Sequence, residues 1–91
     1  MKEKQIEQKL VDEVKNINGW CLKLTGMLGI PDRLVLLPKG KIGFVEVKAP
    51  GKKPRAIQVK RMKQLSALGF LCFVLDDVSE IGGIIHAIQS T

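Results

Sequence analysis

The stretch KIGFVEVK, residues 41–48, has the length and apolar character of a β-strand, yet it carries a charged pair near its end. Side chains alternate between the two faces of a strand, so Glu46 and Lys48 share one face and the valines between them lie on the other. Apolar residues on both faces indicate a strand that is covered on both sides. The alternative is a surface ion pair at the end of the strand, where both charges reach water.

The rest of the chain supplies elements that can cover this strand. Helical spacing of apolar residues, short apolar runs, and glycine and proline breaks divide the chain into helices and strands. The predicted elements are a helix over 2–18, strands over 20–24, 32–37 and 41–48, a helix over 54–68, a strand over 70–75 and a helix from about 76 to 89. The order αβββαβα predicts one α/β domain over residues 1–91. The second and third strands should form an antiparallel hairpin, and the continuous apolar run of the fourth predicts cover on both of its faces.

Composition and charge narrow the range of functions. The chain has 15 Lys and Arg against 9 Asp and Glu, a net charge of +6 that favours a polyanionic partner. The absence of tyrosine excludes a tyrosine nucleophile, and the single His86 excludes a site built from two histidines of one chain. No stretch reaches the roughly 20 apolar residues of a membrane span, and the first residues lack an apolar signal region, so we expect a cytoplasmic protein. Carboxylate chemistry fits this composition best.

Asp32 is placed to join the charged pair, because the predicted hairpin folds it back towards Glu46. If residues 38–41 all lay in the turn, Asp32 would face away from Glu46. We therefore predict a loop of odd length there, or a bulge near residues 31–32, either of which brings Asp32 onto the face of Glu46 and Lys48. The alternative role of this aspartate is that of a turn residue after a proline.

Two polar residues interrupt the apolar faces of the predicted helices. Glu7 falls inside the apolar arc of the first helix, and Glu3 projects the same way. Gln58 falls inside the inner arc of the helix over 54–68. Glu7 could instead be solvated at the first turns, and Gln58 could bond a nearby backbone group at the helix end.

Carboxylates that converge beside a lysine form an oxygen-rich site of the kind that Mg²⁺ or Mn²⁺ prefers. An ion there would offset the charge that develops on a phosphate during hydrolysis. Lys48, one strand period from Glu46, could orient a water or stabilise that charge. The pattern therefore indicates metal-dependent hydrolysis of a phosphodiester.

The motifs Gly29-Ile30-Pro31-Asp32 and Glu46-Val47-Lys48, with Gln58 in a following helix and Glu7 in a leading one, resemble the PD-(D/E)xK nuclease superfamily. The G-x-P-D form and the glutamine are most similar to the VRR-NUC, or virus-type replication-repair nuclease, family. The resemblance implies an αβββαβ(α) core with a mixed sheet flanked by helices. It also implies that Asp32, Glu46 and the backbone carbonyl of Val47 bind the metal, that Lys48 is catalytic, that Glu7 completes the acidic cluster and that Gln58 supports the site.

The same resemblance implies a stand-alone, phage-like enzyme that cleaves duplex or branched DNA such as Holliday junctions. A two-fold homodimer would place two sites on two antiparallel strands. Phosphate contacts are expected from the basic loop after the site strand and from one arginine of the hairpin: Lys52, Lys53, Arg55 and Arg33.

Two other functions fit the composition. A basic domain of this kind can bind nucleic acid through phosphate contacts without catalysis, although inward carboxylates would then repel the backbone. A subunit of a larger complex could instead dock through the apolar face of the last helix, residues 81–88. That face could equally hold a second copy of the chain.

Overall fold

The computed structural model describes residues 1–91 and has the predicted order of elements. Its helices and strands are α1 (Glu3–Asn16), β1 (Trp20–Lys23), β2 (Arg33–Leu37), β3 (Lys41–Val47), α2 (Ala56–Ala67), β4 (Leu71–Leu75) and α3 (Ile81–Gln89), with short 3₁₀ turns at Pro38–Gly40 and Val78–Glu80. The four strands form one mixed sheet in the order β1-β2-β3-β4. β1, β2 and β3 are antiparallel, and β4 runs parallel to β3 because α2 forms the crossover between them.

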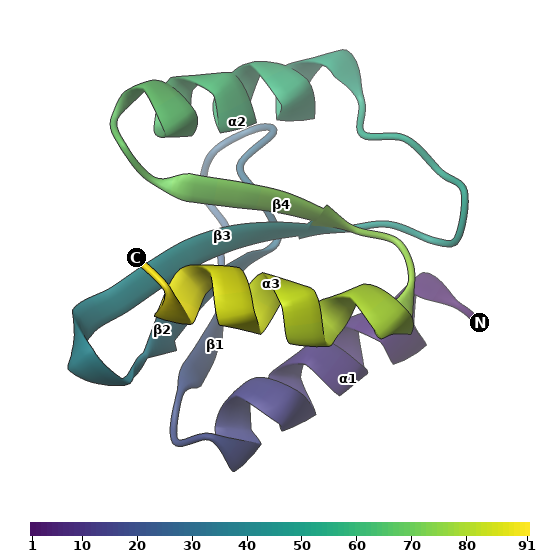
Figure 1. The fold of residues 1–91 in the computed structure, drawn as a ribbon. Coiled ribbons are helices and arrows are strands. Elements are labelled where there is room, and N and C mark those ends of the chain that lie inside the picture. The colour runs from purple at the N-terminus through teal and green to yellow at the C-terminus, as the bar shows by residue number, and fades with distance from the viewer.

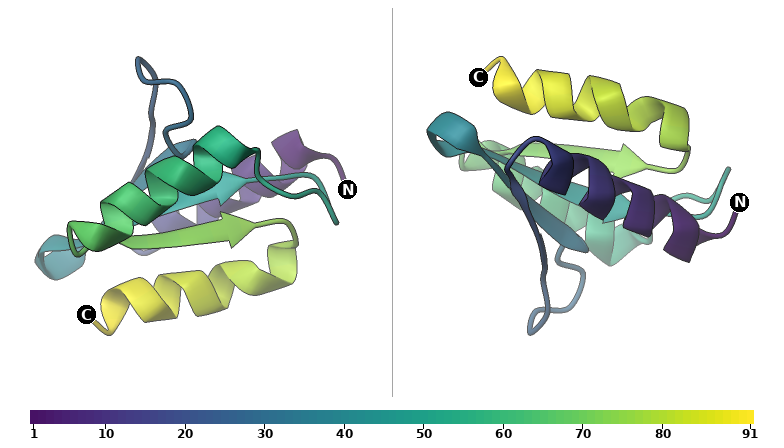
Figure 2. Two further views of the ribbon diagram at one scale, coloured as in Figure 1. Left: turned by 90° about the horizontal axis from the view of Figure 1, so that it is seen from above. Right: turned by 90° about the horizontal axis from the view of Figure 1, so that it is seen from below.

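The helices cover the two faces of the sheet unequally, as Figures 1 and 2 show. α1 and α3 lie together on one face, and α2 alone lies on the other. Eleven buried apolar residues form the core, and those of the sheet point towards α1 and α3; they are Ile6, Leu10, Val14, Val35, Leu37, Val45, Val47, Leu75, Ile81, Ile84 and Ile88. The core is therefore one-sided, and α2 covers a sheet face on which few side chains are buried.

The hairpin has the odd-length loop that places Asp32 beside Glu46. Leu37 pairs with Lys41, so three residues form the turn, and Arg33 pairs with Val45. The next position along the hairpin sets Asp32 opposite Glu46, which confirms the predicted register.

No helix is both long and apolar enough to cross a membrane.

β4 lies between α2 on one face and α3 on the other, as the sequence predicts. It is an edge strand with a neighbouring strand on one side only, so Leu75 is its one buried residue. One alternative for the C-terminal part is wrong. The apolar face of the last helix is not free for docking, since Ile81, Ile84 and Ile88 are buried against the sheet and α1. The amphipathic pattern of that helix is satisfied within the domain itself.

Candidate active site

Glu46 lies at the centre of the candidate site, on the face of β3 that meets α2. Its side chain is 1% exposed, and one of its oxygens, Oε2, accepts a hydrogen bond of 2.7 Å from Gln58 Nε2. The Nζ of Lys48 lies 3.4 Å from the same oxygen. The other oxygen, Oε1, is buried and has no hydrogen-bond partner. A buried carboxylate oxygen without a partner is costly, so this atom is poised for a cation or a proton.

The surroundings of Glu46 favour its protonated form in the absence of a cation. Burial, and next to it the nearby charge of Asp32, raise the pKa of Glu46 from 4.5 to about 7, although the charge and hydrogen bond of Lys48 act in the opposite direction. Desolvation changes the pKa of Glu46 more than Lys48 does, because the ammonium is only one neighbour, whereas burial removes water from the whole carboxylate. A pKa this far from the usual value is common at functional sites.

Asp32 reaches the same region from the start of β2. Its Oδ2 accepts a hydrogen bond of 2.8 Å from the backbone N–H of Val47, across the hairpin. This bond fixes the carboxylate beside the end of β3. Asp32 therefore does more than end a turn after the buried Pro31, because it also raises the pKa of Glu46.

The chemistry of these donors fits a hard divalent cation such as Mg²⁺ or Mn²⁺, which binds carboxylate and carbonyl oxygens. The unpartnered Oε1 of Glu46 is the main observation behind this fit. No group of three or more His, Cys, Asp and Glu side chains gathers around one point. The oxygen groups that could hold such an ion here are the carboxylates of Asp32 and Glu46 and the backbone carbonyl of Val47.

Gln58 has two roles at once, and each uses one end of its amide. It is the third residue of α2, and its Oε1 accepts a hydrogen bond of 2.8 Å from the backbone N–H of Arg55, which caps the helix. Its Nε2 donates to Glu46. The helix-capping alternative and the functional role are therefore both present. The glutamine links the position of the carboxylate to the start of α2.

Glu7 lies apart from this cluster. Its Oε2 accepts a hydrogen bond of 2.8 Å from Arg33 Nε, and both side chains are 17% exposed. Arg33 pairs with Val45, so it faces α1, on the opposite side of the sheet from Glu46. The structure thus separates Glu7 from the expected acidic cluster, and Glu3 is exposed. The sequence predicts that Glu7 lies on the apolar face of its helix. It does not predict which face of the sheet that helix covers.

Arg33 is also committed to internal contacts. In addition to its bond to Glu7, it donates a hydrogen bond of 3.1 Å from its Nη1 to the carbonyl oxygen of Cys21. These bonds hold the start of β2 against α1 and β1. Because they occupy the guanidinium of Arg33, the structure does not support the expected phosphate contact at this residue. The other three expected phosphate contacts, Lys52, Lys53 and Arg55, are exposed in the loop between β3 and α2.

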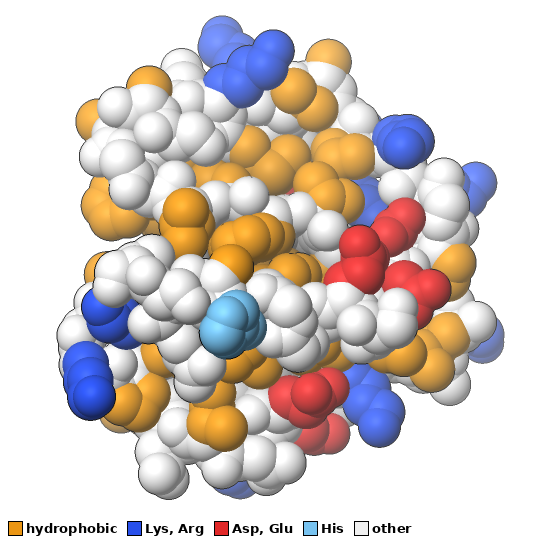
Figure 3. All heavy atoms as spheres, viewed as in Figure 1, with side chains coloured by type: hydrophobic (Ala, Val, Ile, Leu, Met, Phe, Trp, Pro, Cys, Tyr) orange, Lys and Arg blue, Asp and Glu red, His pale blue; other side chains and the backbone are white.

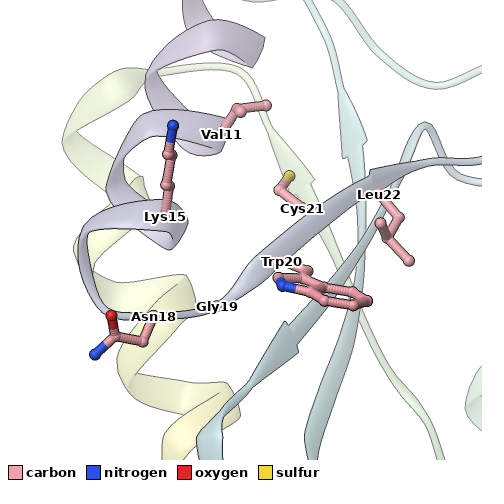
Figure 4. Close-up of a pocket in the computed structure, with 7 residues that line it drawn as sticks. All are labelled: Val11, Lys15, Asn18, Gly19, Trp20, Cys21 and Leu22. Carbon is pink, nitrogen blue, oxygen red and sulfur yellow. The ribbon is translucent and has the colours of Figure 1, made fainter.

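Further basic residues extend this charge along α2. Lys60 and Lys63 are exposed and line a shallow hollow on the outer surface of the helix with Ala56, Val59, Gln64 and Ala67. Figure 3 shows Lys and Arg side chains gathered over α2. The three-residue spacing of these two lysines, which places them on one side of a helix, is the signal for this charge in the sequence. Another hollow, between α1 and β1, contains no carboxylate (Figure 4).

Comparisons with known proteins find relatives that match nearly the whole chain. No family model matches the chain. The chain is 46% identical over 91 residues to "Putative nuclease p44" of Acyrthosiphon pisum secondary endosymbiont phage 1, and the match covers 98% of this chain and 97% of that protein. A solved structure described as "VRR_NUC domain" superposes with a TM-score of 0.86 at 28% identity, covering 94% of this chain and 97% of the other.

Proposed function

Since this chain belongs to the VRR-NUC family of nucleases, we propose that it is a metal-dependent endonuclease that hydrolyses phosphodiester bonds of DNA. The observation that supports the proposal most is the buried, unpartnered Oε1 of Glu46 beside Asp32 and Lys48. A protein that only bound phosphates would gain nothing from two carboxylates placed together, because they repel the DNA backbone.

Each residue of the proposed site has a distinct task. Asp32 and Glu46, with the carbonyl of Val47, would hold Mg²⁺ or Mn²⁺. When bound, the ion supplies Lewis-acid stabilisation of the charge that develops on the scissile phosphate. Lys48, whose Nζ lies 3.4 Å from Glu46 Oε2, would orient the attacking water or stabilise the charge that develops on that phosphate. Gln58 positions the Glu46 carboxylate. Glu7 holds Arg33 on the other side of the sheet and is not among the proposed metal ligands.

The proposed substrate is duplex or branched DNA, such as a Holliday junction, as the family resemblance implies. The exposed loop residues Lys52, Lys53 and Arg55, continued by Lys60 and Lys63 on α2, would bind phosphates. Since the similar protein p44 comes from a phage, the proposed setting is the cytoplasm of a bacterial host.

A homodimer is part of the proposal, and the sheet offers a surface for it. We call the α2 side of β1, β2 and β3 the apolar sheet face; its residues are Trp20, Leu22, Leu34, Leu36, Ile42 and Phe44. None of these side chains is buried, and Trp20 is 68% exposed. Figure 4 shows Trp20 and Leu22 on the opposite side of β1 from Cys21, which points towards α1. Two chains of net charge +6 repel each other, and an uncharged apolar face is where that repulsion matters least.

The free edge of β4 continues this surface. Phe70, just before the strand, is 39% exposed and meets Phe44 edge-to-face, with ring centroids 5.7 Å apart. Val74 is 37% exposed. Figure 3 shows the resulting band of hydrophobic side chains between α2 and α3. A second copy that packed here would cover both the edge and the apolar sheet face.

The proposed activity is tested by cleavage of labelled duplex, flap and four-way-junction DNA in Mg²⁺, Mn²⁺ or EDTA. The wild type is compared with Lys48→Ala and with Lys9→Ala, which removes an exposed lysine of α1. We expect metal-dependent cleavage by the wild type and Lys9→Ala, a loss of at least 100-fold in Lys48→Ala, and DNA binding by all three. Binding without cleavage under every metal condition would identify a non-catalytic binding module instead.

A further inference from the structure

The loop between β1 and β2, residues 24–32, projects from the body of the molecule (Figure 2). Two large apolar side chains of this loop, Met27 and Leu28, follow each other in sequence, and we call this pair the tip. Met27 is 55% exposed and Leu28 is 71% exposed. Exposing adjacent large apolar residues at such a position has a cost in water, so they point to a surface that they contact in function.

The loop is held in place by specific contacts. Arg61 of α2 donates from its Nε to the backbone oxygen of Leu28 over 3.0 Å. At the base of the loop, the N–H of Leu24 donates to the carbonyl of Asp32 over 2.9 Å. A loop tied at its base and near its tip loses little entropy when it makes a new contact.

Gly29 explains why the loop can approach α2 so closely. Its φ is +81°, and a Cβ at this position would lie 2.7 Å from the side chain of Ile57 in α2. Any other residue would strain the backbone and clash with the helix. The first glycine of the G-x-P-D motif therefore sets the position of the preceding apolar pair.

The tip is close to the proposed site along the chain. Asp32 comes four positions after Leu28 in the sequence, and an extended chain spans at most about 3.6 Å per residue, so their Cα atoms lie within roughly 14 Å. Successive nucleotides of one DNA strand rise by about 3.4 Å. A strand that ran from Asp32 towards Leu28 would therefore cover the distance in about four nucleotides.

The charges around the tip favour a nucleic acid. No acidic residue occurs between Glu13 and Asp32, and Lys23 and Arg61 flank the loop. The apolar side chains of the tip could contact the bases of DNA, while the cations beside them could contact the phosphates on either side. Leucine and methionine are among the side chains that proteins insert between base steps to unstack them.

We propose that Met27 and Leu28 form an apolar wedge that unstacks a base step of the DNA, a few nucleotides from the bond that is cleaved. The proposal rests on the proposed function, since it takes DNA as the substrate. Arg61 and Gly29 act as positioning residues for the wedge. Such a wedge favours substrates in which a base step is already weakened, for example at a branch point.

The test uses DNA with the fluorescent base 2-aminopurine beside a branch point, titrated in EDTA so that no strand is cut. The variant Leu28→Ser is compared with Leu68→Ser, which removes a leucine of matching exposure, 73%, at the end of α2. Binding of the wild type and of Leu68→Ser should raise the emission at least threefold, because unstacking relieves quenching. Saturating Leu28→Ser should give less than half of that rise, and its cleavage preference for branched over plain duplex should fall about tenfold.

The outcomes separate this proposal from the proposed function. Equal emission from Leu28→Ser and wild type, or no rise with wild type, overturns the wedge, whatever the cleavage assay shows. An emission rise that depends on Leu28, without cleavage in Mg²⁺ or Mn²⁺, supports the wedge and refutes the nuclease. If Leu28→Ser turns a dimer into a monomer in sedimentation, or abolishes co-sedimentation with anionic lipid vesicles, the tip belongs to a protein or lipid contact and the wedge is overturned.

Discussion

Gln58 Nε2 donates to Glu46 Oε2 over 2.7 Å at the point where α2 meets β3, and the other oxygen of that carboxylate stays buried without a partner. The glutamine thereby orients the carboxylate and leaves Oε1 for another ligand. This arrangement lowers the stability of the metal-free protein, because the carboxylate is either protonated or buried as an unsatisfied anion.

Without metal, the free energy of unfolding should fall as the pH rises from about 4.5 to 7. The raised pKa of Glu46 means that the folded protein holds a proton which the unfolded chain has released. This contribution is fully present below pH 4.5 and is lost as the pH passes through about 7; it is on the order of 3 kcal/mol. Urea unfolding in EDTA at one protein concentration measures it. Glu46→Gln should remove this pH dependence and be more stable than wild type at pH 8, and parallel curves for the two proteins would contradict the prediction.

Gln58→Ala should weaken Mn²⁺ binding by about 10- to 100-fold, because the carboxylate loses the donor that orients it. The matched control is Gln5→Ala. Gln5 is the equivalent capping residue of α1, on the other face of the sheet from α2, and accepts a hydrogen bond of 2.8 Å from the N–H of Lys2. Each variant should lose about 1 kcal/mol of stability from the cap. Calorimetric titration of the two variants with Mn²⁺ measures their affinities. Equal affinities would mean that Gln58 only caps its helix.

The pair Glu7–Arg33 should contribute to stability rather than to metal affinity. A double-mutant cycle with Glu7→Gln and Arg33→Gln should give a coupling energy of about 1–3 kcal/mol, since both side chains are largely buried. The Mn²⁺ affinity of Glu7→Gln should stay within about threefold of wild type, whereas Asp32→Asn should lose at least tenfold. A large loss of Mn²⁺ affinity in Glu7→Gln would show instead that this glutamate takes part in the metal site.

Trp20, the only tryptophan, should report the proposed dimer. It is 68% exposed in the single chain, so its emission should lie at long wavelength in dilute solution. If the apolar sheet face binds a second copy, the emission should move to shorter wavelength as the protein is concentrated, in step with the mass from sedimentation equilibrium. Leu36→Glu, on the same face, should abolish both changes, because a buried unpaired charge is costly. A dimer that forms without a shift of Trp20 emission would place the interface elsewhere.

Local sequence patterns were sufficient for the element order and for the centre of the site. The strand period put Glu46 and Lys48 on one face, and the demand that Asp32 join them led to the odd-length hairpin loop that the structure has. These features depend on neighbours in sequence or across one turn, where geometry is tightly constrained.

Tertiary structure decided the rest. The helical period showed that Glu7 shares the apolar side of α1, but only the docking of α1 on the sheet face opposite Glu46 gave that carboxylate Arg33 as its partner. In the same way, the apolar run of β4 did not reveal an edge strand, since that depends on how many strands lie beside it. The sequence by itself determined which residues turn inward; the packing of distant elements determined what they meet there, because periodicity carries no information about the partner surface.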